Sequence, residues 1–94
     1  MNLNMQDDKK VLQFKKAVGN VIRNIRLSRT DMSLNKLALE YDFDKGNLSK
    51  TERGLYSIYL ITAWQLSEAL GLKFSEFAKL LEQELGEDFT LIDE

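Results

Sequence analysis

Lysine and arginine side chains, which bind phosphate groups, are concentrated in the N-terminal part of this 94-residue chain. Residues 1–53 hold eleven basic and seven acidic side chains, a net charge of +4. Residues 54–94 hold two basic and eight acidic ones, a net charge of −6. Nucleic-acid phosphates are bound by local basic clusters, so the overall charge of −2 does not exclude them. The asymmetry indicates either a basic binding face or two ordinary solvated faces.

Catalytic and metal-binding chemistry has few candidate residues. The chain contains neither cysteine nor histidine, which excludes disulfides, thiolate and imidazole metal sites, Cys-His catalysis and Ser-His-Asp catalysis. The 15 carboxylates are scattered along amphipathic segments and show no paired constellation. We therefore expect no enzyme activity and no cofactor or metal.

The length and composition are those of one globular domain. Hydrophobic residues make up 44% of the chain and charged residues 30%. This is too apolar for a disordered chain, and charges interrupt it too often for a membrane span of about 20 apolar residues. The polar N-terminus has no apolar stretch typical of a secretory signal. We expect a cytoplasmic protein without a membrane partner.

The absence of proline and the spacing of apolar residues at three and four predict an all-α chain. Ser33, Asp44 and Ser57 are the expected N-caps of its second, third and fourth helices. The fourth helix is expected to bury one side, formed by Leu60, Ala63, Trp64, Leu66 and Leu70. The five expected helices cover residues 8–27, 34–41, 45–53, 57–71 and 74–85.

The glycines indicate where helices end or touch. Gly54 and Gly71 suit the left-handed conformation that ends many helices. Gly19 lies inside the first helix, where glycine costs about 1 kcal/mol relative to alanine. It indicates either a close helix contact or a break between an N-terminal extension and the helix proper. The residues after Gly86 are either a frayed end or a short strand.

Two short helices separated by three residues form a helix-turn-helix arrangement, whose second helix can enter a DNA major groove. Residues 33–54, SLNKLALEYDFDKGNLSKTERG, resemble the Xre-type helix-turn-helix of Cro and phage-repressor proteins. The resemblance continues through ALGL at 69–72 and covers residues 18–77. It implies a compact five-helix bundle of the lambda-repressor-like type with a short C-terminal tail. The expected parts are a helical extension (1–17), the Xre-type domain (18–81) and an acidic tail (82–94).

The resemblance also implies roles for individual residues. The helix at 45–53 is expected to enter the major groove. Its base-reading positions are Lys45, Gly46, Asn47, Ser49 and Lys50. Phosphate contacts are expected from Asn35, Lys36, Arg53 and Tyr56.

A family ion pair is expected between Glu52 and Arg26, holding the first helix to the recognition helix; an exposed pair of little energetic weight is the alternative. The chain departs from the family pattern at four positions. Leu34 stands in place of a phosphate-binding Gln, Asp42 in place of a turn Gly, Asp44 in place of a Ser or Thr cap, and Thr51 in place of an aliphatic core residue.

Three functions are consistent with these features. The first is a sequence-specific, double-stranded DNA-binding transcriptional regulator that occupies an operator as a homodimer. The second is an antitoxin that represses its own operon and binds a toxin through residues 82–94. The third is a helical protein-interaction module without DNA binding.

The expected dimer surface is the last helix and the tail, with the apolar residues Phe77, Leu80, Leu81, Leu85, Phe89, Leu91 and Ile92. Phe77 and Leu81 are expected to close the core instead, leaving Phe89, Leu91 and Ile92 for a partner. The N-terminal lysines at 9, 10, 15 and 16 are expected either to reach the DNA backbone or to cover another subunit.

Overall fold

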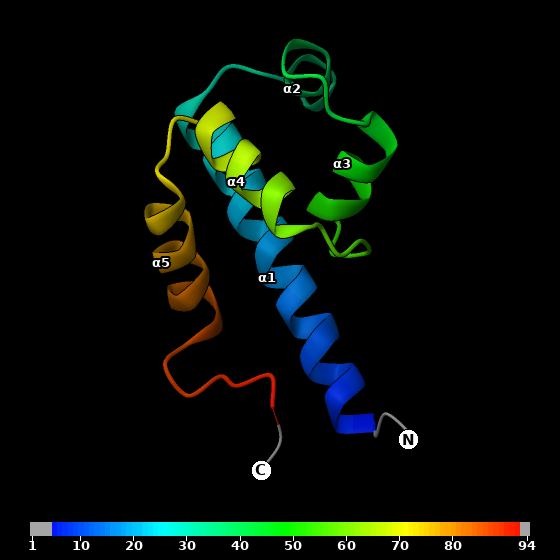
Figure 1. Cartoon of the computed structure of the whole chain (residues 1–94), viewed down its shortest axis with the longest axis vertical. Helices are drawn as coiled ribbons and strands as arrows, with labels where there is room; N and C mark the ends of the chain where they lie inside the picture. The colour runs from blue at the N-terminus through cyan, green and yellow to red at the C-terminus, as the bar shows by residue number, and fades with distance from the viewer. Residues whose placement is uncertain (1–4, 93–94) are drawn as a thin grey trace.

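The fold is all-α, as the sequence predicts. A computed structural model describes the backbone of residues 5–92 and the side chains of residues 9–92. Its five helices are α1 (Met5–Arg29), α2 (Leu34–Glu40), α3 (Lys45–Glu52), α4 (Leu60–Ala69) and α5 (Phe74–Leu85) (Figure 1). The described residues contain no strand, so the segment after Gly86 is not one.

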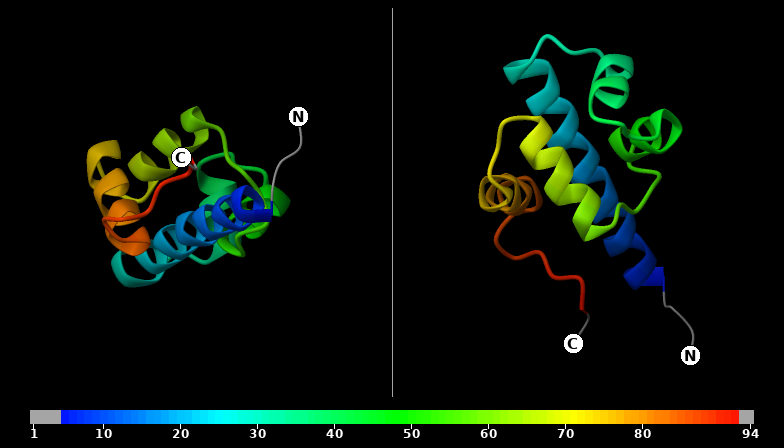
Figure 2. Two further views of the ribbon diagram at one scale, coloured as in Figure 1. Left: turned by 90° about the horizontal axis from the view of Figure 1, so that it is seen from below. Right: turned by 45° about the horizontal axis from the view of Figure 1, so that its top comes forward.

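The long helix α1 is the scaffold against which the others are arranged. It contacts both α3 and α5, while α2 packs on α3 and α4 packs on α5. The α2–α3 pair therefore lies on one side of α1 and α5 on the other (Figures 1 and 2). The core between them is mainly apolar, with Arg26, Thr51 and Ser67 as buried polar residues. Its apolar cluster contains Val18, Val21, Ile22, Ile25, Leu37, Ala38, Leu48, Ala63, Leu66, Leu70, Leu72 and Phe77.

Gly19 marks a close helix contact and not a break. Helix α1 runs without interruption through this position. A Cβ at Gly19 would overlap the carbonyl oxygen of Thr51 and lie 2.6 Å from that of Glu52. The backbone at the C-terminal end of α3 therefore rests directly on α1, and only glycine leaves room for it.

The turn between α2 and α3 is built by local hydrogen bonds. The Phe43 N–H donates to the Ala38 carbonyl at 2.9 Å, and Asp42 takes the left-handed conformation with φ 58°. Asp tolerates this conformation better than most residues. The Asp44 carboxylate accepts from the Asn47 N–H at 2.8 Å and caps α3 as predicted.

A buried ion pair fixes α3 to α1, as the family resemblance implies. The Arg26 Nε donates to Glu52 Oε2 at 2.8 Å and Nη2 donates to Oε1 at 2.9 Å. The two side chains are only 10% and 6% exposed, which rules out the alternative of an exposed pair. Nη1 donates to the Met32 carbonyl at 3.2 Å, so the same guanidinium also holds the loop before α2.

The hydrogen bonds that the Arg26 guanidinium donates to Glu52 raise the pKa of Arg26, an effect that burial partly opposes. Because this pKa lies higher in the folded protein, the resulting stabilisation is complete at every pH below the ordinary pKa of an arginine side chain. It is lost only as the pH rises through the still higher value of the folded state. Arg26 therefore remains charged at every pH at which the protein would be used.

The predicted start of the fourth helix and part of its buried face are wrong. Helix α4 begins at Leu60 and not after Ser57, because Ile58 packs against the core and keeps the preceding chain extended. Leu60 is 69% exposed and Trp64 is 51% exposed. The Trp64 ring instead covers Phe74, with ring centroids 5.0 Å apart.

The segment after α5 folds back onto the N-terminal part of α1 (Figure 1). The Phe89 ring stacks on Phe14 with centroids 6.3 Å apart, and the Lys10 ammonium donates to the Thr90 hydroxyl at 3.3 Å. Phe89 therefore has a partner within the chain, contrary to the expectation that it awaits another subunit. The two ends of the described chain are thus packed together.

The contact at Gly19 predicts that Gly19→Ala destabilises the protein. Overpacking against the α3 backbone should lower the free energy of unfolding by about 1 to 3 kcal/mol. Gly46→Ala is the matched control, since its Cβ would meet no backbone atom and only the side-chain Oδ1 of Asp44, at 3.3 Å. The control should be neutral or stabilising by up to about 1 kcal/mol. Urea unfolding measures both, and equal stability of the two variants would contradict the close contact.

The buried pair predicts that Glu52→Leu costs about 3 to 5 kcal/mol, because it leaves the Arg26 charge buried without its partner. The double variant Arg26→Met/Glu52→Leu should recover most of this loss, since well-packed apolar residues can replace a buried ion pair. Urea unfolding of the two variants and of Arg26→Met gives the coupling. A cost below about 1 kcal/mol for Glu52→Leu is the behaviour of an exposed pair and would disprove the clamp.

Candidate nucleic-acid interface

Helix α3 buries one face and leaves the other in solvent. Leu48 and Thr51 are 3% and 1% exposed and join it to the core. The Thr51 hydroxyl, polar where an aliphatic residue is usual, donates to the Asn47 carbonyl at 2.7 Å, which satisfies it inside the core. The opposite face has exposed Lys45, Gly46 and Lys50. The two lysine side chains and the Gly46 backbone are therefore accessible to a ligand.

The other two predicted base-reading residues are less open. Ser49 and Asn47 are both half-buried. Asn47 lines a hollow of about 210 Å³ between α3 and α4, and Tyr56 lines the same hollow. The structure thus brings Asn47 together with a residue predicted to bind phosphate, in a hollow that Lys45 and Lys50 do not line.

Two α4 residues complete this hollow and were not predicted. Thr62 and Gln65 line it beside Asn47 and Tyr56. Their hydroxyl and amide groups can donate to or accept from a phosphate or a base edge. Because the sequence places them on the polar side of an otherwise ordinary amphipathic helix, only the packing of α4 beside α3 reveals them.

The three remaining predicted phosphate-binding residues are exposed and do not line this hollow. Asn35 and Lys36 are exposed in the first turn of α2, whose N-cap Ser33 accepts from the Lys36 N–H at 3.1 Å. Arg53 is exposed just beyond α3, and its Nε donates to the Ser49 carbonyl at 3.4 Å. Together with the α3 lysines they border one side of the α2–α3 pair.

Charge is divided along α3. Asp42 and Asp44 are exposed at its N-terminal end, where the Asp44 carboxylate is the helix cap. At the C-terminal end Lys50 and Arg53 are exposed, and Glu52 is the only acidic residue between positions 45 and 59. Because its carboxylate is paired with Arg26, the net charge of this end is positive.

Exposed apolar side chains gather over the start of α4 and not on α5. Phe77 is 3% exposed, and Leu80 and Leu81 pack against the core. The exposed large residues of the 55–64 segment, here called the α4 apolar row, are Leu55 at 57%, Tyr59 at 73%, Leu60 at 69%, Ile61 at 69% and Trp64 at 51%. Three successive apolar residues at 59–61 cannot all face one core, so the sequence alone indicates that some of them are exposed.

Two further properties concern the described residues only. No group of three or more Asp or Glu side chains in residues 9–92 could hold a metal ion. No described helix is long and apolar enough to cross a membrane.

Two curated proteins are similar to this chain. Control protein C.BamHI of Bacillus amyloliquefaciens is 40% identical over 55 residues, which cover 58% of this chain and 68% of that protein. Control protein C.MunI of a Mycoplasma species is 30% identical over 66 residues, which cover 70% of this chain and 89% of that protein.

No model of a known protein family matches the chain, and no solved structure matches it. The assignment therefore depends on the two control proteins and on the helix-turn-helix arrangement of α2 and α3. Both agree with the resemblance in residues 33–54. The chain belongs to the Xre-type helix-turn-helix family that includes these control proteins.

Proposed function

We propose that this protein is a transcriptional regulator that binds double-stranded DNA in a sequence-specific manner, with α3 in the major groove. The observation that carries the proposal is the exposed polar face of α3, held in a fixed orientation by the Arg26–Glu52 pair and by the α1 contact at Gly19. A helix so fixed presents its side chains to base edges without the entropic cost of ordering it. Similarity to two proteins named as control proteins supports a regulatory role.

The exposed residues suggest a division of labour. The Lys45 and Lys50 ammonium groups can donate to guanine O6 and N7 in the groove. Ser49 can bond to either kind of base edge, and Gly46 permits close approach of the backbone. Asn47, half-buried beside Tyr56, is suited either to adenine or to a phosphate.

Phosphates would be bound by the exposed residues Asn35, Lys36 and Arg53 and by Tyr56 in the hollow. These contacts would fix the register of α3 in the groove. The hollow between α3 and α4 adds Thr62 and Gln65 to this set. Phosphate contacts give salt-dependent affinity that is largely independent of sequence.

A second copy of the chain is the partner that fits the α4 apolar row. One recognition helix reads only a few base pairs, so helix-turn-helix proteins commonly use two half-sites about 34 Å apart. The row begins at Leu55, two residues after Arg53, so a two-fold contact through it would fix the spacing of two α3 helices. Five large apolar residues exposed within one short segment are more than a monomer commonly shows.

The α3 assignment predicts that Lys45→Ala/Lys50→Ala abolishes recovery of a sequence motif from pooled random duplexes. The wild-type protein should retain a palindromic motif at 50 mM salt, with binding weakened at 200 mM salt through release of counterions. Lys73→Ala/Lys79→Ala removes the same charge from the opposite region of the chain and should leave the motif unchanged. Sequencing the retained duplexes measures both. Retention of no duplex by the wild type at 50 mM salt would refute DNA binding and favour a protein-interaction module.

The dimer assignment predicts that Ile61→Lys converts a dimer into a monomer, because it places a charge in the centre of an apolar contact. Sedimentation equilibrium should show half the mass of the wild type. Leu27→Lys is the control, since Leu27 is a comparably exposed apolar residue, at 57%, on α1. A dimer that survives Ile61→Lys would direct attention to Leu91 and Ile92, the exposed apolar residues of the tail.

A further inference from the structure

The N-terminal part of α1 extends past the C-terminal end of the recognition helix. The two helices touch at residues 16–19 of α1, where a Cβ at Gly54 would lie 2.8 Å from Lys16 Cγ and 2.9 Å from Lys16 Cα. Helix α1 begins at Met5, so about 16 Å of helix lies beyond this contact at 1.5 Å per residue. This part of α1 lies outside the α2–α3 pair but adjoins its positive end.

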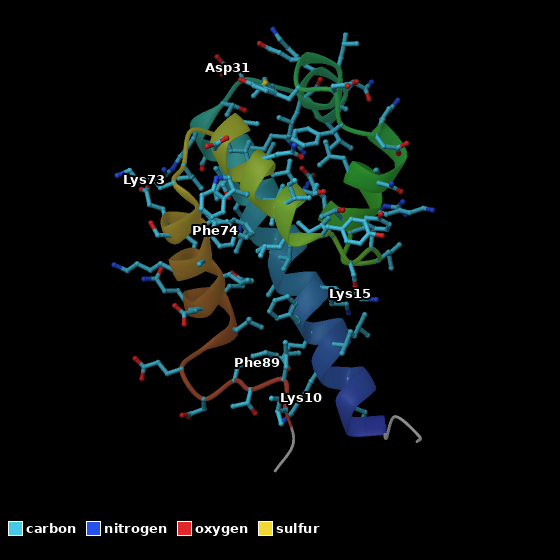
Figure 3. All side chains as sticks on the ribbon, in the orientation of Figure 1. Lys10, Lys15, Asp31, Lys73, Phe74 and Phe89 are labelled. Carbon is cyan, nitrogen blue, oxygen red and sulfur yellow. The ribbon has the colours of Figure 1, made fainter. Side chains whose placement is uncertain are left out.

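Lys15 and Lys16 stand on either side of the line along which α1 meets α3. Successive residues of an α-helix are separated by about 100° around its axis. Gly19, which faces α3, lies between the directions of these two lysines. Figure 3 shows Lys15 on the α3 side of α1, whereas Lys10 lies on the other side next to Phe89. The side chains that flank α3 are therefore distinct from the one that the tail engages.

The surroundings of the two lysines are electropositive. Residues 9–29 of α1 contain seven basic side chains and no acidic one. Beyond the contact, Lys50 and Arg53 are exposed, and the Glu52 carboxylate is bound by Arg26. Among the described residues neither Lys15 nor Lys16 forms an ion pair.

One carboxylate faces this part of α1 from another element. Glu84 of α5 lines a hollow that Lys16 also lines, but its Oε2 accepts a hydrogen bond from the Asn20 side-chain amide at 3.3 Å. Lys15 does not line that hollow. Lys15 is half-buried and Lys16 is exposed. Lys16 borders both this hollow and Gly54, whereas Lys15 lies on the α3 side of α1 (Figure 3).

We propose that Lys15 and Lys16 bind DNA phosphates just outside the half-site read by α3, so that the long α1 extends the contact along the duplex. The inference depends on the DNA-binding function proposed above and adds a second anchoring site to it. Its occupant is the DNA backbone, because continuity with the basic end of α3 places both lysines beside the same duplex. Such contacts would strengthen binding without changing which sequence is read.

The test compares salt dependence for Lys15→Gln/Lys16→Gln and for Lys73→Gln/Lys79→Gln, which removes equal charge from the acidic half. The duplex is the motif retained by the wild type, made both with long flanks and trimmed to its half-sites. The slope of log K against log salt should fall by about 0.9 per lost contact in the first variant only, equivalent to about eightfold in affinity per contact at 100 mM salt. Lys15→Arg/Lys16→Arg should restore the slope.

Duplex length separates a phosphate contact from a structural role. With long flanks the wild type should bind more tightly than with the trimmed duplex, and Lys15→Gln/Lys16→Gln should lose this gain. Equal slopes for the two Gln variants, or a slope loss matched by a lower melting temperature and unaffected by flank length, would overturn the proposal. If the Lys15–Lys16 proposal fails in this way while every variant still binds the trimmed duplex, the DNA-binding function proposed for α3 stands. Absence of wild-type binding to either duplex would instead refute the proposed function itself.

Discussion

The Arg26–Glu52 pair is the interaction on which the orientation of α3 depends. Helix α3 has only eight residues, too few for an isolated helix to be stable in water. Two hydrogen bonds that form one bidentate contact join its last residue to α1, and a third from the same guanidinium holds the Met32 carbonyl before α2. One buried charge pair therefore sets the positions of α1, α3 and the entry to α2 together. The pair contributes a fixed relative position of these segments, since apolar residues could supply the same stability.

The Arg26–Glu52 pair can form because two glycines, which have no side chain, let α1 and the end of α3 approach closely. Gly19 lets the Thr51 and Glu52 carbonyls approach α1, and Gly54 lets the chain leave α3 against Lys16. Both glycines are required by the same close contact, Gly19 on α1 and Gly54 just after α3. The crossing also determines what lies beside the end of α3, namely the Lys15–Lys16 turn of α1. A structural requirement thereby brings additional positive charge next to the C-terminal end of α3.

Features governed by local physics could be predicted from the sequence. Asp44, Gly54 and the Asp42 turn form local hydrogen bonds or backbone conformations that depend on neighbouring residues, and they stand where expected. The start of α4 and the exposure of Trp64 could not be predicted, because they depend on Ile58 and Phe74, which lie on other segments. For the site, the outward position of Lys45 and Lys50 was implied by the family resemblance, and both are exposed. The hollow shared by Asn47 and Gln65 could not be predicted, since it exists only through the packing of α4 beside α3.

The distribution of charge suggests why a protein with net charge −2 can still be suited to DNA. The acidic residues of α5 and the tail lie across α1 from α3, and charges separated by more than a Debye length of about 8 Å are largely screened. Near α3 the balance is decided by a few groups. Asp44 is bound as a helix cap, Glu52 is neutralised by Arg26, and Lys50 and Arg53 are exposed and form no ion pair among the described residues. Because the positive charge lies at the C-terminal end of α3, the salt dependence of binding should come mainly from that end and the adjoining α1, with sequence discrimination left to the exposed face between them.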